Sequence, residues 1–101
     1  MQVMDTKVLK AIAHHLDPIV TIGNAGLSTS VIAELKRAIS DHELIKIRLN
    51  VGDRKYRREL AHEVAQLLSA KLVQQIGKVL VVYRPNDQTC PGLSNITRFG
   101  H

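Results

Sequence analysis

The stretch TIGNAGLSTS, residues 21–30, places two glycines three positions apart, where a β-branched run gives way to hydroxyl residues. Peptide N–H groups at the start of a helix lack partners within the helix, and the helix dipole favours an anion at that end. Gly23 and Gly26 have no side chains, so a sugar-phosphate backbone could approach such groups closely, with Asn24 and Ala25 at the tip of the loop. A tight turn that requires positive φ would explain the same glycines. The loop alone therefore leaves an anion site and a plain turn both open.

Positive charge is concentrated between residues 46 and 58. Six of these thirteen positions are Lys or Arg and only one is acidic, in a chain with 14 Lys and Arg, nine Asp and Glu, and a formal net charge of +5. This concentration supports a phosphate-facing surface and an ordinary solvated face about equally. Lys7 and Lys10 could join the cluster in the folded chain, although not all of the cations can share one face. The candidate phosphate contacts are Lys36, Arg37, Lys46, Arg48, Arg54, Lys55, Arg57 and Arg58.

Motifs for catalysis and metal binding each fail at a defined position. His62 and Glu63 begin like the zinc-binding helix of a metalloprotease, but Gln66 stands where the second histidine ligand belongs. The segment 26–30 lacks the final glycine of a nucleophile elbow, because Ser30 occupies that position. We therefore expect no enzyme, no cofactor and no metal site. A catalytic site assembled from distant residues is the weaker alternative.

The composition is that of one small globular domain. The 101 residues are 45% hydrophobic and only 3% aromatic, so the core must be built mainly from Val, Ile, Leu and Ala. A single cysteine, Cys90, cannot form an internal disulfide, which fits a reducing compartment. No apolar run reaches the length of a signal sequence or a membrane span. We expect a cytoplasmic monomer with no membrane partner.

Hydrophobic periodicity predicts three helices and four strands in the order α-β-α-β-α-β-β. Apolar spacing predicts helices over 6–16, from the N-cap Ser28 to about Asp41, and after the N-cap Asp53. The third helix is expected to carry Tyr56, Leu60, Val64, Leu67 and Leu68 on its apolar side. The strands are expected at 19–22, 44–49, 72–76 and 79–84.

The order of these elements predicts an α/β fold of two layers, a mixed four-stranded sheet with three helices. Strands that alternate with helices favour right-handed crossovers and parallel pairing, and Gly77-Lys78 is typical of a two-residue hairpin that adds one antiparallel strand. Residues 1–85 are expected to form the domain. Pro, Gly and Asn punctuate residues 86–101 without periodicity, which predicts a flexible C-terminal tail.

Three blocks of the sequence, in order and at natural spacing, resemble one known family. They are the GxxG loop at Gly23–Gly26, the HELIK strand entry at His42–Lys46 and the IGK…YR hairpin at Ile76–Arg84. Together they resemble the chloroplast RNA splicing and ribosome maturation (CRM) domain, in the stand-alone bacterial form of the YhbY-like proteins, over about residues 5 to 85. The resemblance implies a fold similar to the C-terminal domain of bacterial translation initiation factor three. It also implies RNA binding through the GxxG loop and the flanking basic surface, and association with precursors of the large ribosomal subunit.

The main hypothesis is a non-enzymatic RNA-binding protein that acts in large-subunit assembly, with large-subunit rRNA or its precursor particle as partner. The alternative is a protein-interaction adaptor that docks acidic partners through the same surface. Since the sequence offers no row of exposed aromatic residues, we expect recognition through RNA shape and phosphate rather than through base stacking.

Overall fold

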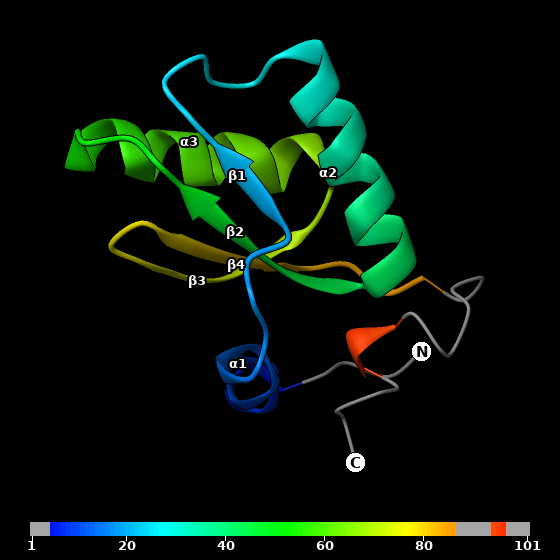
Figure 1. Cartoon of the computed structure of the whole chain (residues 1–101). Helices are drawn as coiled ribbons and strands as arrows, with labels where there is room; N and C mark the ends of the chain where they lie inside the picture. The colour runs from blue at the N-terminus through cyan, green and yellow to red at the C-terminus, as the bar shows by residue number, and fades with distance from the viewer. Residues whose placement is uncertain (1–4, 87–93, 97–101) are drawn as a thin grey trace.

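The computed structural model describes residues 5–86 and 94–96. Its elements follow the predicted order, and their ends differ from the predicted ends by one or two residues (Figure 1). The helices are α1 (Thr6–His14), α2 (Thr29–His42) and α3 (Arg54–Leu67). The strands are β1 (Val20–Ile22), β2 (Leu44–Leu49), β3 (Lys71–Ile76) and β4 (Val79–Tyr83).

The four strands form one mixed sheet in the order β1-β2-β4-β3. β1 pairs with β2 in parallel, whereas β4 pairs with both β2 and β3 in antiparallel orientation. The prediction of a mixed sheet with one antiparallel strand is confirmed. Parallel pairing is limited to β1 and β2, because β4 inserts between β2 and β3 and keeps those two strands apart.

α2, which follows β1, and α3, which follows β2, are both capped by the predicted residues. The Ser28 side chain accepts a hydrogen bond from the Val31 N–H at 3.3 Å. The Asp53 carboxylate accepts bonds from the N–H groups of Lys55 at 2.9 Å and Tyr56 at 3.4 Å. Each cap satisfies helix donors that have no backbone partner, which fixes where α2 and α3 start and how their first turns face the loops.

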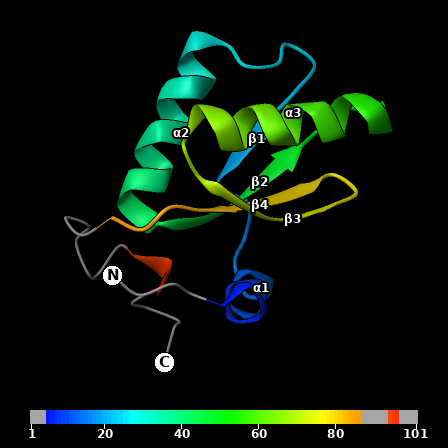
Figure 2. The same cartoon turned by 180° about the vertical axis from the view of Figure 1, so that it is seen from behind.

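The two faces of the sheet are covered differently (Figures 1 and 2). α2 and α3 cover one face, where Ile22, Leu35 and Leu60 belong to the main core. α1 lies on the other face, in a second cluster that includes Leu9 and Val81. The expected α/β fold with a mixed four-stranded sheet and three helices is confirmed, and α1 adds a partial third layer to the two that were expected. A strand that is covered on both faces needs apolar side chains at successive positions, and β4 has the continuous apolar sequence VLVVY.

The apolar side of α3 is shorter than predicted. Tyr56 and Leu67 were expected on it, but they are 36% and 37% exposed. The buried residues of the helix are Leu60, Ala61, Val64 and Ala65. Figure 1 shows the first turn of α3 projecting beyond the ends of β1 and β2, so that only the middle of the helix lies over the sheet.

Part of the predicted tail is held against the domain. The Glu43 carboxylate accepts hydrogen bonds from the Asn86 N–H at 2.8 Å and from the Ser94 hydroxyl at 2.6 Å. Asn95 donates its side-chain amide to the Leu44 carbonyl at 2.7 Å, and both Ser94 and Asn95 are buried. Flexibility does not describe these residues, because irregular backbone can still be anchored by polar side chains. Residues 87–93 and 97–101, with Cys90 among them, lie outside the described residues.

Candidate functional site

The GNAG loop, residues 23–26, connects β1 to α2 and is closed by its own backbone. The Gly26 N–H donates to the Gly23 carbonyl at 3.0 Å, and the Ser28 N–H donates to the Gly26 carbonyl at 3.1 Å. Gly26 has a φ of 72°, and a β-carbon there would lie 3.1 Å from the Tyr56 hydroxyl oxygen. Gly26 is therefore required both by the turn and by the packing of α3 against the loop.

Gly23 has no comparable structural reason to be a glycine. Its φ lies outside the left-handed region, and a β-carbon there would meet no heavy atom of the described structure within 4 Å, chain neighbours apart. Asn24 and Ala25, between the two glycines, are exposed. The turn explains Gly26 but not Gly23, whose bare backbone faces open space.

The first turn of α3 lies beside this loop. Tyr56 links the two segments through Gly26, and the Asn50 N–H donates to the Ile22 carbonyl at 2.8 Å, which holds the ends of β1 and β2 together. Tyr56 thus joins the GNAG loop to the start of α3, the segment that also carries the exposed cations Arg54, Lys55 and Arg58. We call this set the loop–α3 surface; it comprises Gly23, Asn24, Ala25, Gly26, Arg54, Lys55, Tyr56 and Arg58.

Arg57 belongs to the same helix turn but serves the fold. Its Nη1 donates hydrogen bonds to the carbonyls of Val51 at 2.7 Å and Gly52 at 3.0 Å, and its Nε is buried. These bonds hold the connection between β2 and α3. Arg57 adds positive charge near the loop, yet its guanidinium is already engaged with backbone carbonyls.

The remaining predicted cations lie elsewhere. Lys46 and Arg48 alternate with the core residues of β2, so they point to the face of the sheet that carries α1. Lys36 and Arg37 are exposed on α2, and Arg37 lies 3.8 Å from Asp41 in an ion pair along the helix. The predicted set therefore splits among three places, and only the α3 cations belong to a segment that packs against the GNAG loop through Tyr56.

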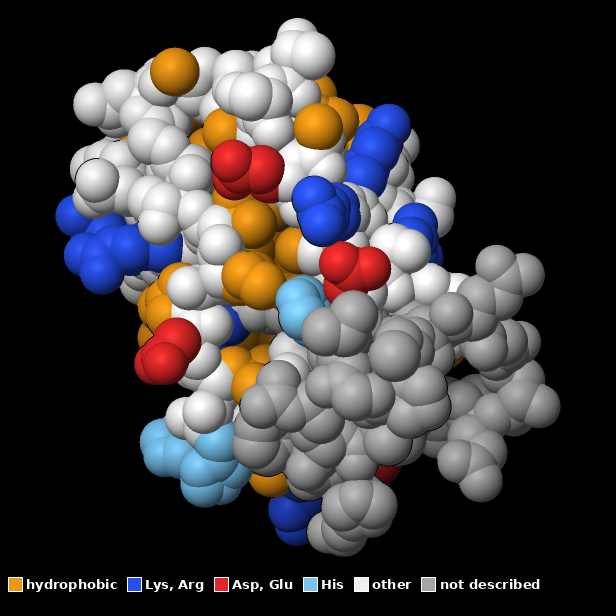
Figure 3. All heavy atoms as spheres, turned by 45° about the vertical axis from the view of Figure 1, so that its right-hand side comes forward, with side chains coloured by type: hydrophobic (Ala, Val, Ile, Leu, Met, Phe, Trp, Pro, Cys, Tyr) orange, Lys and Arg blue, Asp and Glu red, His pale blue; other side chains and the backbone are white. Residues whose placement is uncertain are grey.

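Arg37 borders an apolar hollow between α2 and β1. Ile19, Val20 and Ala38 contribute apolar side chains to this hollow, and Glu34 stands at its rim with Arg37. Figure 3 shows the exposed apolar side chains between acidic and basic ones. The mixture of charges makes this hollow a poor phosphate site, in contrast to the loop–α3 surface.

Tyr56 is the residue of the site that sequence reasoning misplaced. Its position three residues after the cap Asp53 suited the apolar stripe of α3. Helical side chains, however, lean towards the helix N-terminus, so a long side chain in the first turn reaches the preceding loops. From this direction of the side chain, the sequence could have predicted that the Tyr56 ring lies beside Gly26.

Within residues 5–86 and 94–96, no group of three or more His, Cys, Asp or Glu side chains is placed to hold a metal ion. Burial, with a smaller contribution from the Glu43 carboxylate, raises the pKa of Tyr83, which keeps its phenol neutral. None of the described helices is both long and apolar enough to cross a membrane.

Comparison with known proteins gives consistent matches. The family model of the CRS1/YhbY (CRM) domain matches residues 1–84. A Pseudomonas aeruginosa protein named a probable RNA-binding protein is 46% identical over 93 residues, which are 92% of this chain and 89% of that protein. A Haemophilus influenzae protein named an RNA-binding protein is 40% identical over 79% of this chain and 81% of its own length. The solution structure of a hypothetical Staphylococcus aureus protein superposes with a TM-score of 0.72 at 30% identity, over 84% of this chain and 88% of that one.

Proposed function

Since the chain belongs to the CRS1/YhbY (CRM) family, we propose that it binds RNA through the loop–α3 surface and acts in assembly of the large ribosomal subunit. The relatives named as RNA-binding proteins support RNA as the partner. The observation that carries the proposal is Gly23, a bare and unobstructed backbone position in the loop that Tyr56 joins to the cation-bearing start of α3.

The surface suits a phosphate backbone for two physical reasons. Gly23 leaves room for a sugar-phosphate strand against the loop, which a β-carbon would narrow. Arg54, Lys55 and Arg58 add positive charge at the N-terminus of α3, where the helix dipole has the same sign. The proposed contact thus depends on charge and close approach, with no covalent step and no metal or cofactor.

Tyr56 modifies the expectation that base stacking plays no part. The ring is 36% exposed and its hydroxyl touches the loop. An aromatic ring beside a phosphate-binding loop can stack with one unpaired base, and stacking of this kind tolerates any sequence. We propose that selectivity comes mainly from RNA shape, with Tyr56 favouring an unpaired nucleotide at the loop.

The partner we propose is large-subunit rRNA or its precursor particle, bound by a cytoplasmic monomer. A tagged copy of the chain, sedimented through a ribosome gradient, should travel with large-subunit precursors and should be released from them by RNase. If the protein stays on the particle after RNase treatment, an acidic protein partner replaces RNA as the better explanation. If it never enters the particle fractions, the assembly role is wrong.

A further inference from the structure

The face of the sheet that α1 partly covers carries cations without acids. α1 and all four strands contain no Asp or Glu, whereas α2 and α3 each contain two. The cations of these elements are Lys7, Lys10, Lys46, Arg48 and Lys71. Three acids flank these elements: Asp5 caps α1, Glu43 bonds to the C-terminal segment, and Asp17, which follows α1, lines a neighbouring hollow together with Lys46.

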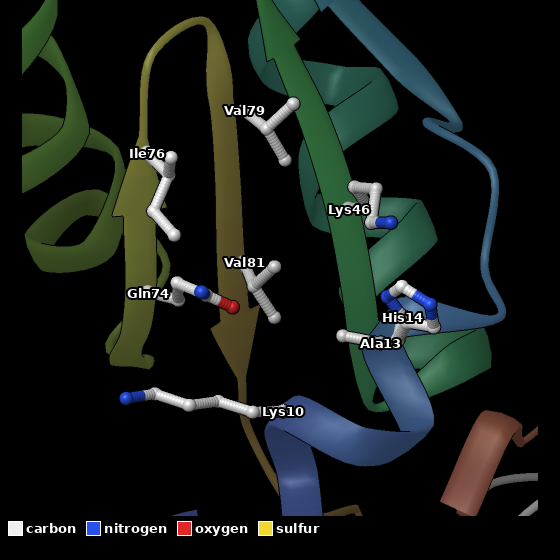
Figure 4. Close-up of a pocket in the computed structure, with 8 residues that line it drawn as sticks. All are labelled: Lys10, Ala13, His14, Lys46, Gln74, Ile76, Val79 and Val81. Atoms are coloured by element: carbon white, nitrogen blue, oxygen red, sulfur yellow. The ribbon is translucent and has the colours of Figure 1, made fainter.

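A groove of about 290 Å³ lies between α1 and the bare part of this face. Figure 4 shows Lys46 and His14 on one side of the groove and Lys10 and Gln74 on the other. Val79 and Val81 lie between them on β4, and Ile76 lies on the same strand as Gln74, so the floor of the groove is apolar. We call this feature the α1–sheet groove.

Strand register orders the side chains of this face into rows. Lys46 pairs with Val81, and Arg48 pairs with Val79, so the two cations of β2 flank the apolar residues of β4. Alternate residues of one strand stand about 6.8 Å apart, close to the distance between successive phosphates of an extended nucleic-acid strand. Two consecutive phosphates could therefore each meet one cation.

A bulge in β3 brings a polar side chain into the groove. Leu72 pairs with Val82 and Gln74 pairs with Val81, so Val73 is the extra residue. Strict alternation would turn Gln74 to the side of α2 and α3, but the bulge places both Val73 and Gln74 on the α1 side. The Gln74 amide can donate and accept hydrogen bonds, as the edge of a base or a ribose hydroxyl requires.

We propose that the α1–sheet groove binds a segment of single-stranded RNA, separately from the loop–α3 surface. The proposal rests on RNA being the partner of this chain. Cations without acids complement a phosphate backbone, and the exposed Ile76 offers apolar contact to a ribose or base. The volume lies at the lower limit of small-molecule pockets and is too small for a double helix, so it suits one strand that passes across the sheet.

The two surfaces would then hold two stretches of RNA. The loop–α3 surface lies at the carboxyl ends of β1 and β2, whereas the groove faces the side of the sheet opposite α2 and α3. Arg48 is exposed next to the hairpin turn, which contacts β2 where the Leu49 N–H donates to the Lys78 carbonyl. Positive charge thus continues from the groove towards the edge where the loop–α3 surface begins.

The test uses the full chain and an unstructured oligouridine of eight nucleotides. In an NMR titration of nitrogen-labelled protein, the amide signals of Lys46, Gln74 and Val79 should shift with added RNA. Lys46→Gln with Arg48→Gln should remove these shifts and weaken oligouridine binding at least about tenfold, because two phosphate contacts are lost. Lys36→Gln with Arg37→Gln removes the same charge from α2, outside both surfaces, and should bind within about twofold of the unaltered chain.

A second variant protects the test against misfolding. Ile76 is 64% exposed, so Ile76→Asp should fold normally and place a carboxylate at the groove floor, again weakening oligouridine binding. Shifts confined to the loop–α3 surface would overturn the groove while leaving the proposed function standing. Failure to bind any RNA, including an rRNA fragment, would overturn the proposed function itself. Groove shifts with a polyglutamate peptide but none with oligouridine would replace RNA by an acidic protein segment.

Discussion

The loop–α3 surface and the α1–sheet groove both present cations, but they differ in how far the same residues also hold the fold. At the loop, Gly26 adopts the left-handed φ that closes the turn, and Arg57 nearby bonds to two carbonyls. On the groove side of the sheet, Lys46 and Arg48 project from a strand that is held by its backbone pairing. A substitution in the groove can remove charge alone, whereas one at the loop can remove structure as well.

Ionic strength should give the largest effect and should show how many phosphates each surface holds. Four or five phosphate contacts give a slope of log affinity against log salt of roughly −3 to −4. The affinity for structured RNA should therefore fall about 60- to 250-fold between about 50 and 200 mM salt. If the groove holds two phosphates, Lys46→Gln with Arg48→Gln should make the slope shallower by about 1.4. Fluorescence anisotropy over a salt series measures both slopes, and a slope near zero would remove the electrostatic mechanism.

The tip of the GNAG loop allows charge to be changed without touching either glycine. Asn24→Asp with Ala25→Asp should preserve the fold yet lower affinity for a large-subunit rRNA fragment at least about tenfold, because two carboxylates would face phosphate. Thermal melting and filter binding on one purified sample measure both quantities.

Ala33→Glu with Gln66→Glu is the matched control for these two added charges. Both positions are exposed on helices outside the two surfaces, so this variant should retain most of its affinity. Unchanged affinity in a well-folded Asn24→Asp, Ala25→Asp variant would mean that the loop is only a turn, and the assignment of the loop–α3 surface would be wrong.

Local patterns were sufficient to predict the elements because each one depends on neighbouring residues. Ser28 and Asp53 cap the helices that they were expected to cap, and the alternation in Leu44–Leu49 gives the observed strand. The insertion of β4 between β2 and β3 depends on pairing between segments more than thirty residues apart, which local patterns do not encode. The apolar stripe of α1 predicts that this helix packs against the sheet, but it does not predict which face of the sheet the helix covers.

The candidate site was predictable as a list of residues but not as an arrangement. The pattern of two glycines marks the loop, yet only the φ of Gly26 and the position of Tyr56 separate the roles of the two glycines. A count of charges groups Arg57 with the neighbouring cations as a phosphate contact, although its guanidinium already donates hydrogen bonds to the carbonyls of Val51 and Gly52. The groove depends on a one-residue bulge in β3, and no sequence feature that we identified marks that bulge.

The two glycines should give opposite results when each is replaced by alanine. Gly26→Ala should lower the free energy of unfolding by about 1 to 2 kcal/mol, because an L-residue is strained at a φ of 72° and its β-carbon would crowd Tyr56. Gly23→Ala should leave that free energy unchanged or raise it by up to about 1 kcal/mol, yet should weaken RNA binding. Urea denaturation and filter binding measure the two effects. A large loss of stability in Gly23→Ala would mean that both glycines are needed for the turn itself, not for RNA binding.

Adjacent arginines of α3 provide the smallest and most discriminating contrast. Arg57→Gln should lower the free energy of unfolding by about 1 kcal/mol, because the Val51 and Gly52 carbonyls lose their charged donor. Arg58→Gln removes the same charge from an exposed side chain and should leave the thermal midpoint nearly unchanged while weakening RNA binding. Thermal melting with filter binding separates the two roles, since Arg58 is proposed to contact RNA whereas Arg57 bonds to carbonyls of the chain itself. Equal loss of stability in both variants would make both arginines structural and would leave Arg54 and Lys55 as the cations of the loop–α3 surface.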